Sequence, residues 1–385
     1  MAWSACVSIA NSVLIWIFMA RWRETEVLGK FTIVMSLYML FFTICSLGLS
    51  PFIINETTRL QSSQNEAAKG FISTTAISLL VWGVVCALMM TLTGFAASSS
   101  FEVWISTAIL SLAMIPTGVI TASEAVSISF GRTRLIALVT TLENVLRTVI
   151  PLALIFFGYE LPVIFASFVF VRLTAITIYA FAGRKLFSIF DFDRKVLRRI
   201  IKAAPTFATI TILASLNWQI LAILLGRFST EIETAKYGVA SRFLIPVMIV
   251  MASYASVIQP LIAQKLRDSE TETGVLLSKV VRNVLLVATF AGIVSPFLAT
   301  HVLTVLFGTT YADVAPILNV LALTVAPFCA VMIIARGLVA KNLQKVDLMA
   351  NAVGVFISVA LGSILVTRFG ALGAATTQLV AFLTI

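Results

Sequence analysis

Charged residues are scarce in this chain, as are the residue types that build metal and disulfide sites. Asp, Glu, Lys and Arg make up only 11% of its 385 residues, whereas 60% are apolar. His301 is the only histidine, and one imidazole cannot form a zinc site. The four cysteines form no CxxC pair, so neither a metal site nor a disulfide framework is predicted.

Catalytic motifs are also missing. The sequence has no GxxxxGK[ST] motif, and no Ser, His and Asp grouping lies in a loop large enough for an active site. The longest polar stretches reach only about 20 residues, which leaves no room for a soluble domain. We therefore predict that the chain is not an enzyme and uses no cofactor.

Long apolar runs dominate what is present. Eleven runs of about 20 residues and a shorter twelfth predict an all-α integral membrane protein with about 12 transmembrane helices. The last run has 15 residues, which rise only about 22 Å as a helix, so we expect a truncated last helix. The predicted spans are 2–20, 31–54, 71–95, 103–125, 135–157, 162–182, 203–225, 238–261, 280–299, 313–335, 346–367 and 371–385.

The two halves of the chain resemble each other. Segments 29–51 and 238–260 both begin with Gly and end with Pro, and Phe-Gly occurs at 157–158 and again at 369–370. The offsets of 209 and 212 residues nearly agree. Because each half begins on the same side of the membrane, they are predicted to be parallel repeats.

This repeat divides the chain into two six-helix lobes. We predict an N-lobe at 1–182 and a C-lobe at 203–385. The linker at 183–202 contains seven basic residues interleaved with apolar ones. Such a pattern is typical of an amphipathic helix that lies along a membrane surface.

Basic residues are unevenly distributed between alternate loops. If the N-terminus is inside, the inner loops hold 18 Lys and Arg and the outer loops hold six. This bias predicts that both termini are cytoplasmic. It also accounts for most of the net charge of +10, so nucleic-acid binding is not indicated.

Three ionisable residues are predicted near the middle of the membrane. Glu143 and Arg147 share a helix face, and Arg172 lies at equal depth on the next span, because Arg147 and Arg172 are equidistant from the turn between them. Two interpretations remain open. Glu143 satisfies both arginines in a structural cluster, or the arginines bind an anionic group such as pyrophosphate, with Glu143 as their partner or an ion-coupling carboxylate.

Polar residues in other spans also have two interpretations each. Arg242 lies one turn inside a predicted span, where snorkelling to the interface is the simpler explanation. Asn217 and Gln219 place amides inside the seventh span. Hydrogen bonding between helices is the simpler role there, and lining of a transport cavity is the alternative.

Three segments resemble a known family, the polysaccharide-export and O-antigen (Wzx-type) flippases of the multidrug/oligosaccharidyl-lipid/polysaccharide superfamily. Residues 27–59 (VLGKFTIVMSLYMLFFTICSLGLSPFIINETTR) are similar to its "LG-x-y-G … LGL … R" pattern. Residues 235–264 are similar to its "YG-x-A-x-R" segment, and 306–377 to its "FG-x-x-Y-x-x-A-x-P … yG-x-x-G-A" ending.

The resemblance implies two six-helix lobes around a central, often cationic cavity. It implies that a polyprenyl-pyrophosphate-linked oligosaccharide is flipped across the bacterial inner membrane by alternating access. Implied partners are this glycan, membrane lipids, and a glycan polymerase and chain-length regulator. Arg59, Arg242 and Gly370 match family positions. Family members often carry an acidic residue in the seventh span, where this chain has Asn217 and Gln219 instead.

Two other functions stay open at this point. A cation-coupled multidrug exporter of the same superfamily would prefer carboxylates in its cavity, whereas this chain has more arginine there. A non-transporting partner of a glycan-synthesis complex is the second alternative.

Overall fold

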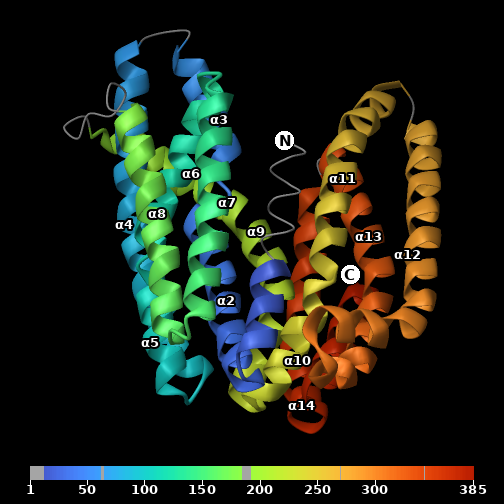
Figure 1. The fold of residues 1–385 in the computed structure, drawn as a ribbon. Coiled ribbons are helices and arrows are strands. Elements are labelled where there is room, and N and C mark those ends of the chain that lie inside the picture. The colour runs from blue at the N-terminus through green and yellow to red at the C-terminus, as the bar shows by residue number, and fades with distance from the viewer. Residues whose placement is uncertain (1–12, 62–64, 184–191, 269, 342) are drawn as a thin grey trace. The chain divides into compact units, whose positions relative to one another are not determined.

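The computed structural model describes residues 13–61, 65–183, 192–268, 270–341 and 343–385, and this described part contains helices and no strand (Figure 1). A short helix, Val13–Trp22, comes first. The elements that follow are α2 (Thr25–Ser46), α3 (Ser50–Gln61), α4 (Asn65–Ala97), α5 (Phe101–Ser111), α6 (Met114–Ser129), α7 (Thr133–Phe156), α8 (Leu161–Gly183), α9 (Arg194–Phe228), α10 (Glu231–Arg242), α11 (Leu244–Asp268), α12 (Glu270–Phe307), the 3₁₀ helix η1 (Thr309–Val314), α13 (Ala315–Ala340) and α14 (Gln344–Thr384).

The all-helical membrane fold is as predicted. Ten helical stretches in the described residues are long and apolar enough to cross a membrane. The first predicted span, 2–20, lies mostly outside the described residues, and its end coincides with the short helix. The last two predicted spans form the single 41-residue element α14, which breaks at Gly370.

Three of the predicted spans are not single helices. Spans 31–54, 103–125 and 238–261 are divided into α2 and α3, α5 and α6, and α10 and α11. The second helix of each pair carries a proline in its first turn: Pro51, Pro116 and Pro246. Proline fits the first turn because the backbone N–H it lacks has no partner within the helix there.

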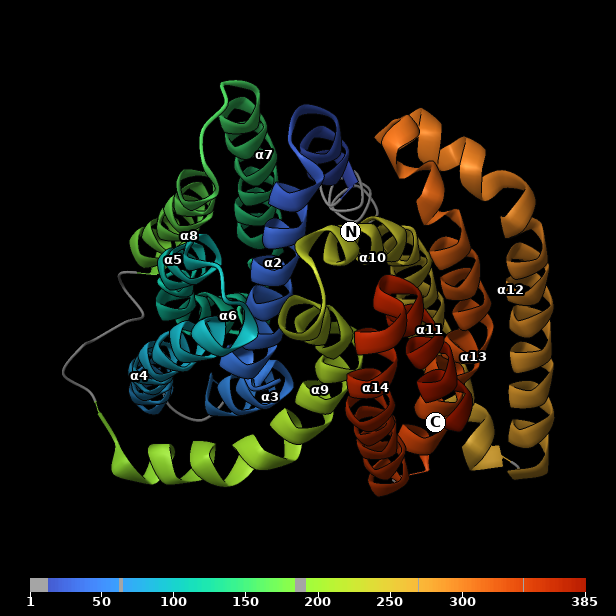
Figure 2. The same cartoon turned by 90° about the horizontal axis from the view of Figure 1, so that it is seen from below.

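The predicted linker is not separate from the span that follows it. Residues 184–191 lie outside the described part, but α9 begins at Arg194 and continues past residue 203 to Phe228. Pro205 lies inside this helix, and Figure 2 shows α9 curving along its length. Proline bends a helix when the surrounding structure supports both sides, so a single curved helix replaces the two predicted elements.

The chain forms two compact units. The described residues of 1–15 and 33–215 belong to the first unit, and those of 16–32 and 216–385 belong to the second. In the first unit α4 packs beside α6, and α7 packs beside α8. In the second unit α13 packs between α12 and α14. The unit boundaries lie within α2 and α9, whereas the lobe boundaries predicted from sequence remain a prediction.

Two glycines at equivalent repeat positions meet at one helix crossing in the second unit. A Cβ atom on Gly29 would overlap with the backbone of Glu231, at the start of α10. A Cβ atom on Gly238 would lie 2.5 Å from Thr32 Oγ1, near the start of α2. α2 and α10 therefore approach each other closely, because glycine occupies both contact positions.

Gly370 allows α14 to turn back on itself. Its φ of 53° and ψ of −131° are strained for any residue with a Cβ atom. The Glu233 carboxylate accepts a hydrogen bond of 2.8 Å from the Ala371 N–H, and so caps the helix that follows the break. Lys236 joins Glu233 to Asp313 through ion pairs of 3.3 and 2.7 Å.

Gly370→Ala is expected to destabilise the protein more than Gly158→Ala. Both glycines have positive φ, but an added Cβ meets nothing within 4 Å at Gly158 and lies 2.5 Å from Glu233 Oε2 at Gly370. The backbone strain alone costs about 1–3 kcal/mol at each site, and only Gly370→Ala adds the clash and disturbs the cap. Thermal unfolding in detergent measures the difference, and equal losses would contradict this account of α14.

Candidate functional site

The three ionisable residues predicted near mid-membrane do meet. Arg147 Nη2 on α7 donates to Glu143 Oε1 at 3.0 Å, one turn away on the same helix. Arg172 Nη1 on α8 reaches the same carboxylate oxygen at 2.9 Å. A single carboxylate therefore bridges two guanidinium groups across the α7–α8 hairpin.

A tyrosine from α2 completes this arginine cluster. Tyr38 is 1% exposed, and its hydroxyl accepts long hydrogen bonds of 3.4 Å from Arg147 Nη2 and Arg172 Nε. Aromatic rings cover the cations, with Phe42 5.1 Å from the Arg172 guanidinium and Phe168 5.8 Å from that of Arg147. Such rings stabilise cations where water is excluded.

The two arginines differ in their exposure and in which of their N–H donors already have a partner. The Arg172 side chain is 6% exposed, and its Nε and Nη1 atoms are both engaged. The Arg147 side chain is 20% exposed, and its buried Nε has no hydrogen-bond partner among the residues that the structure describes. Arg172 therefore serves as the fixed element, while Arg147 keeps donor capacity for a further acceptor.

A second carboxylate near this cluster was missed in the sequence. Glu124 on α6 is half-buried and lies close enough to Arg172 and Glu143 to interact with their charges. The Tyr179 hydroxyl is in the same neighbourhood and has no hydrogen-bond partner among the described residues. When Glu124 is ionised, the net positive charge near the arginines is lower than two arginines and one glutamate alone would give.

The other predicted arginines lie elsewhere. Arg59 on α3 is 63% exposed and pairs with Glu56 at 2.8 Å, three residues earlier on the same helix. Arg242, at the end of α10 in the second unit, places its guanidinium 3.8 Å from the Trp16 ring centre. Its Nε is buried and has no hydrogen-bond partner in the described part of the chain. Snorkelling does not describe Arg242, because the side chain stacks on an aromatic ring inside the protein.

Asn217 belongs to a chain of hydrogen bonds within the second unit. Its Nδ2 donates to Asn351 O and Oδ1, both at 3.2 Å, and Asn351 Nδ2 donates to Asp347 Oδ1 at 3.1 Å. On the other side, Gln378 Nε2 donates to Asn217 O at 3.2 Å, and Gln378 Oε1 accepts from the Tyr237 hydroxyl at 2.8 Å. This amide network joins α9, α10 and both parts of α14, as predicted for bonding between helices.

Gln219 takes no part in the amide network within the described structure. It is half-buried and follows Asn217 by two residues, so the two side chains leave α9 in different directions. Asn217 Oδ1 is buried, and no described residue donates a hydrogen bond to it. No group of three or more potential metal ligands occurs among the residues that the structure describes.

Glu143→Gln is expected to destabilise the protein by about 3–5 kcal/mol, because two buried guanidinium groups lose their carboxylate. Glu56→Gln is the matched control, since its pair with Arg59 is exposed and contributes about 0–1 kcal/mol. Adding Arg172→Gln to Glu143→Gln restores the original charge balance and should recover part of the loss. Unfolding in detergent measures all three variants, and equal effects at Glu143 and Glu56 would contradict a buried bridge.

Asn217→Leu is expected to cost about 0.6–1.7 kcal/mol, the range measured for hydrogen bonds between membrane helices. Gln219→Leu on the same helix should change stability by less than about 0.5 kcal/mol, because its side chain lies outside the amide network. The same unfolding measurement compares them. A larger loss from Gln219→Leu would show that the network is not what holds α9 to α14.

Comparison with known proteins places this chain in a family. Residues 2–266 match the family of polysaccharide biosynthesis proteins. No curated protein matches the chain. Several solved structures do match, at identities that establish the fold alone.

Three of these structures indicate the breadth of that fold. An inward-facing MATE-family multidrug resistance transporter of the MOP superfamily is 13% identical with a TM-score of 0.80, over 99% of this chain and 92% of that one. The lipid II flippase MurJ, in an inward closed conformation, is 16% identical with a TM-score of 0.78, over 99% and 83%. A MOP superfamily transporter from Pyrococcus furiosus Vc1 is 12% identical with a TM-score of 0.64, over 99% and 90%.

These neighbours are transporters and a flippase rather than enzymes, in agreement with the prediction from sequence. The apolar helices and the shared fold make the chain a multi-pass membrane protein. The chain belongs to the polysaccharide biosynthesis protein family and has the fold of MOP-superfamily transporters.

Proposed function

We propose that this protein flips a polyprenyl-pyrophosphate-linked oligosaccharide across the bacterial inner membrane by alternating access, with both termini cytoplasmic. Membership of the polysaccharide biosynthesis family supports a glycan substrate. The likeness to a lipid II flippase supports a fold able to move a lipid-linked substrate. A glycan polymerase and a chain-length regulator are the proposed partners. The proposed domains are an N-lobe at 1–182, a linker at 183–202 and a C-lobe at 203–385.

The observation that carries this proposal is the unused donor capacity of Arg147. Its Nη2 is held by Glu143 and Tyr38, so the planar guanidinium has a fixed position while its Nε remains unpartnered. A guanidinium fork matches the oxygens of a phosphate group better than those of most neutral ligands. In the proposed mechanism the pyrophosphate binds Arg147, and Arg172 and Glu143 hold that arginine in place.

Arg242 and Arg59 are proposed as further contacts of the anionic group, but on different grounds. Arg242 stacks on Trp16 with an unpartnered Nε, which leaves it able to donate to a phosphate oxygen in the second unit. Arg59 is exposed and already pairs with Glu56, so its proposed role rests on the family resemblance. Asn217 and Gln219 remain proposed cavity residues, although the Asn217 amide is engaged in the amide network.

A cation-coupled drug exporter is favoured by one observation, the Glu124 carboxylate beside the arginine cluster. Carboxylates attract cationic drugs and can carry a coupling ion. Glu143 is less suited to that task, because both arginines already bind its Oε1. The substrate therefore decides between the two functions, since only the flippase requires an anionic group at Arg147.

Arg147→Gln is expected to lower flipping at subsaturating substrate by about tenfold to a hundredfold, the effect of losing a charge-assisted hydrogen bond of about 1.5–3 kcal/mol. Stability should change little, because Glu143 keeps Arg172 as its partner. Arg134→Gln, an exposed position on the same helix, is the matched control. The measurement is the accessibility of lipid-linked oligosaccharide from the outer face, in a deletion strain that expresses each variant at equal level.

The outcomes separate the candidate functions. Accumulation of inward-facing oligosaccharide in the deletion strain and with Arg147→Gln, but not with Arg134→Gln, supports the flippase and its anion site. Rescue by Arg147→Gln as complete as that by the unaltered protein would reject Arg147 as the anion contact. Unchanged glycan export in the deletion strain, with no other flippase present, would favour the drug exporter or a non-transporting partner.

A further inference from the structure

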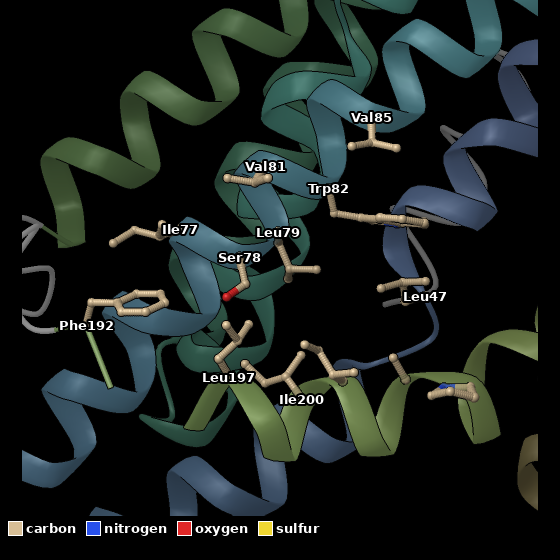
Figure 3. Close-up of a pocket in the computed structure, with 13 residues that line it drawn as sticks. Leu47, Ile77, Ser78, Leu79, Val81, Trp82, Val85, Phe192, Leu197 and Ile200 are labelled. Atoms are coloured by element: carbon tan, nitrogen blue, oxygen red, sulfur yellow. The ribbon is translucent and has the colours of Figure 1, made fainter. Parts of the chain in front are cut away.

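An apolar groove lies between α4 and the start of α9 in the first unit (Figure 3). Its volume is about 420 Å³, which is within the range of small-molecule sites. The only polar side-chain groups among its lining residues are already engaged, since Ser78 donates to Thr74 O at 2.6 Å and Trp82 Nε1 to Ile44 O at 3.1 Å. The groove therefore suits a hydrocarbon chain. Its main lining residues are Leu79, Val81, Trp82, Val85, Leu197 and Ile201.

The start of α9 is fixed against the first unit, so the groove has a firm wall. The Asp193 N–H donates to Thr74 Oγ1 at 2.9 Å, and the Asp193 carboxylate accepts from the Lys195 N–H at 2.7 Å in the first turn of α9. Val196, Ile200 and Ala204 then pack into the apolar core of this unit. Ile200 and Ala204 also line the groove, together with Leu197 and Ile201.

The open side of the groove faces the apolar surface of the protein. Val81 and Ile201 on its rim are 59% and 60% exposed, and Leu88 further along α4 is 63% exposed. These α4 residues belong to the candidate membrane span 68–97, so the surface around the groove is one that bilayer lipid covers. A lipid chain can enter from the side.

Cationic residues stand at the edge of the groove. Arg194 and Arg198 are exposed and precede Ile201 by seven and three residues, which places them on the same face of α9. Lys195 and Arg199 are also exposed but lie about a third of a turn further round the helix, away from the groove. Positive charge beside an apolar groove complements a phosphate group attached to a hydrocarbon chain.

We propose that this groove is a binding site for an anionic phospholipid, with an acyl chain between α4 and α9 and the phosphate on Arg194 and Arg198. The site shares no residue with the arginine cluster and so goes beyond the proposed transport of glycan. A phospholipid is the chosen occupant because the groove opens onto the bilayer surface and its charged edge lies at the start of the helix. Bound lipid would hold the first turns of α9 against α4.

Quenching of Trp82 fluorescence by brominated acyl chains tests this assignment directly. The full-length protein is reconstituted in phosphatidylcholine vesicles that contain increasing fractions of brominated phosphatidylglycerol or brominated phosphatidylcholine. The Trp82 signal is the difference between the protein and its Trp82→Phe variant, each measured in the same lipid. We expect brominated phosphatidylglycerol to quench Trp82 at a lower mole fraction than brominated phosphatidylcholine.

Paired charge variants locate the phosphate. Arg194→Gln with Arg198→Gln should reduce the preference for phosphatidylglycerol by about thirtyfold, at about 1 kcal/mol for each basic residue lost. Lys195→Gln with Arg199→Gln removes the same charge from the other face and should leave most of the preference. Val81→Phe, at the exposed rim, should reduce quenching by both lipids.

Three results would overturn the proposal. Equal quenching by the two lipids would show ordinary surrounding lipid rather than a site. Equal loss of preference in the two charge-variant pairs would show general attraction to a basic helix. If polyprenyl phosphate displaces the brominated lipid at a lower mole fraction than unlabelled phosphatidylglycerol does, the groove binds the tail of a polyprenyl-linked substrate instead.

Discussion

The need to hold charge inside a membrane domain organises the first unit of this protein. A guanidinium group is costly in a hydrocarbon environment unless a partner and hydrogen bonds compensate it. Glu143 meets this need for Arg147 and Arg172 together, and Tyr38 adds an acceptor from a third helix. The positions of α2, α7 and α8 are thereby coupled, because a shift of any one would leave a buried charge without its partner.

In the second unit, buried polar groups are stabilised mainly by an aromatic ring and by neutral amides. Arg242 is stabilised by the face of Trp16, and α9, α10 and α14 are joined by the amide network rather than by ion pairs. Glycines at 29 and 238, which the predicted repeat makes equivalent, both stand at close contacts between α2 and α10. The buried polar chemistry, in contrast, differs between the units.

The sequence predicted those features that depend on local spacing. The meeting of Glu143, Arg147 and Arg172 follows from helix periodicity and one short turn. The residue spacings alone were therefore enough to predict it. Tyr38, Glu124 and Trp16 were missed because their contacts join helices far apart in sequence, and no spacing rule reports such contacts. The continuity of α9 was missed for a related reason: Pro205 is a helix breaker by composition, and only packing against the first unit explains why the helix continues.

The charge balance of the arginine cluster limits how an anionic substrate can be recognised there. Glu143 and Glu124 together offset the two arginines when both carboxylates are ionised, so net charge alone would attract an anion weakly. Recognition must then come from directed hydrogen bonds, and of the two arginines in this cluster Arg147 has an Nε without a partner among the described residues. Because Glu143 and Tyr38 fix its guanidinium before any ligand arrives, little side-chain entropy is lost on binding. A planar, preorganised donor selects for phosphate geometry, whereas a cationic drug would find the Glu143 carboxylate already bound by both arginines. The arrangement therefore favours a phosphate-bearing substrate over a cation, for reasons of geometry more than of charge.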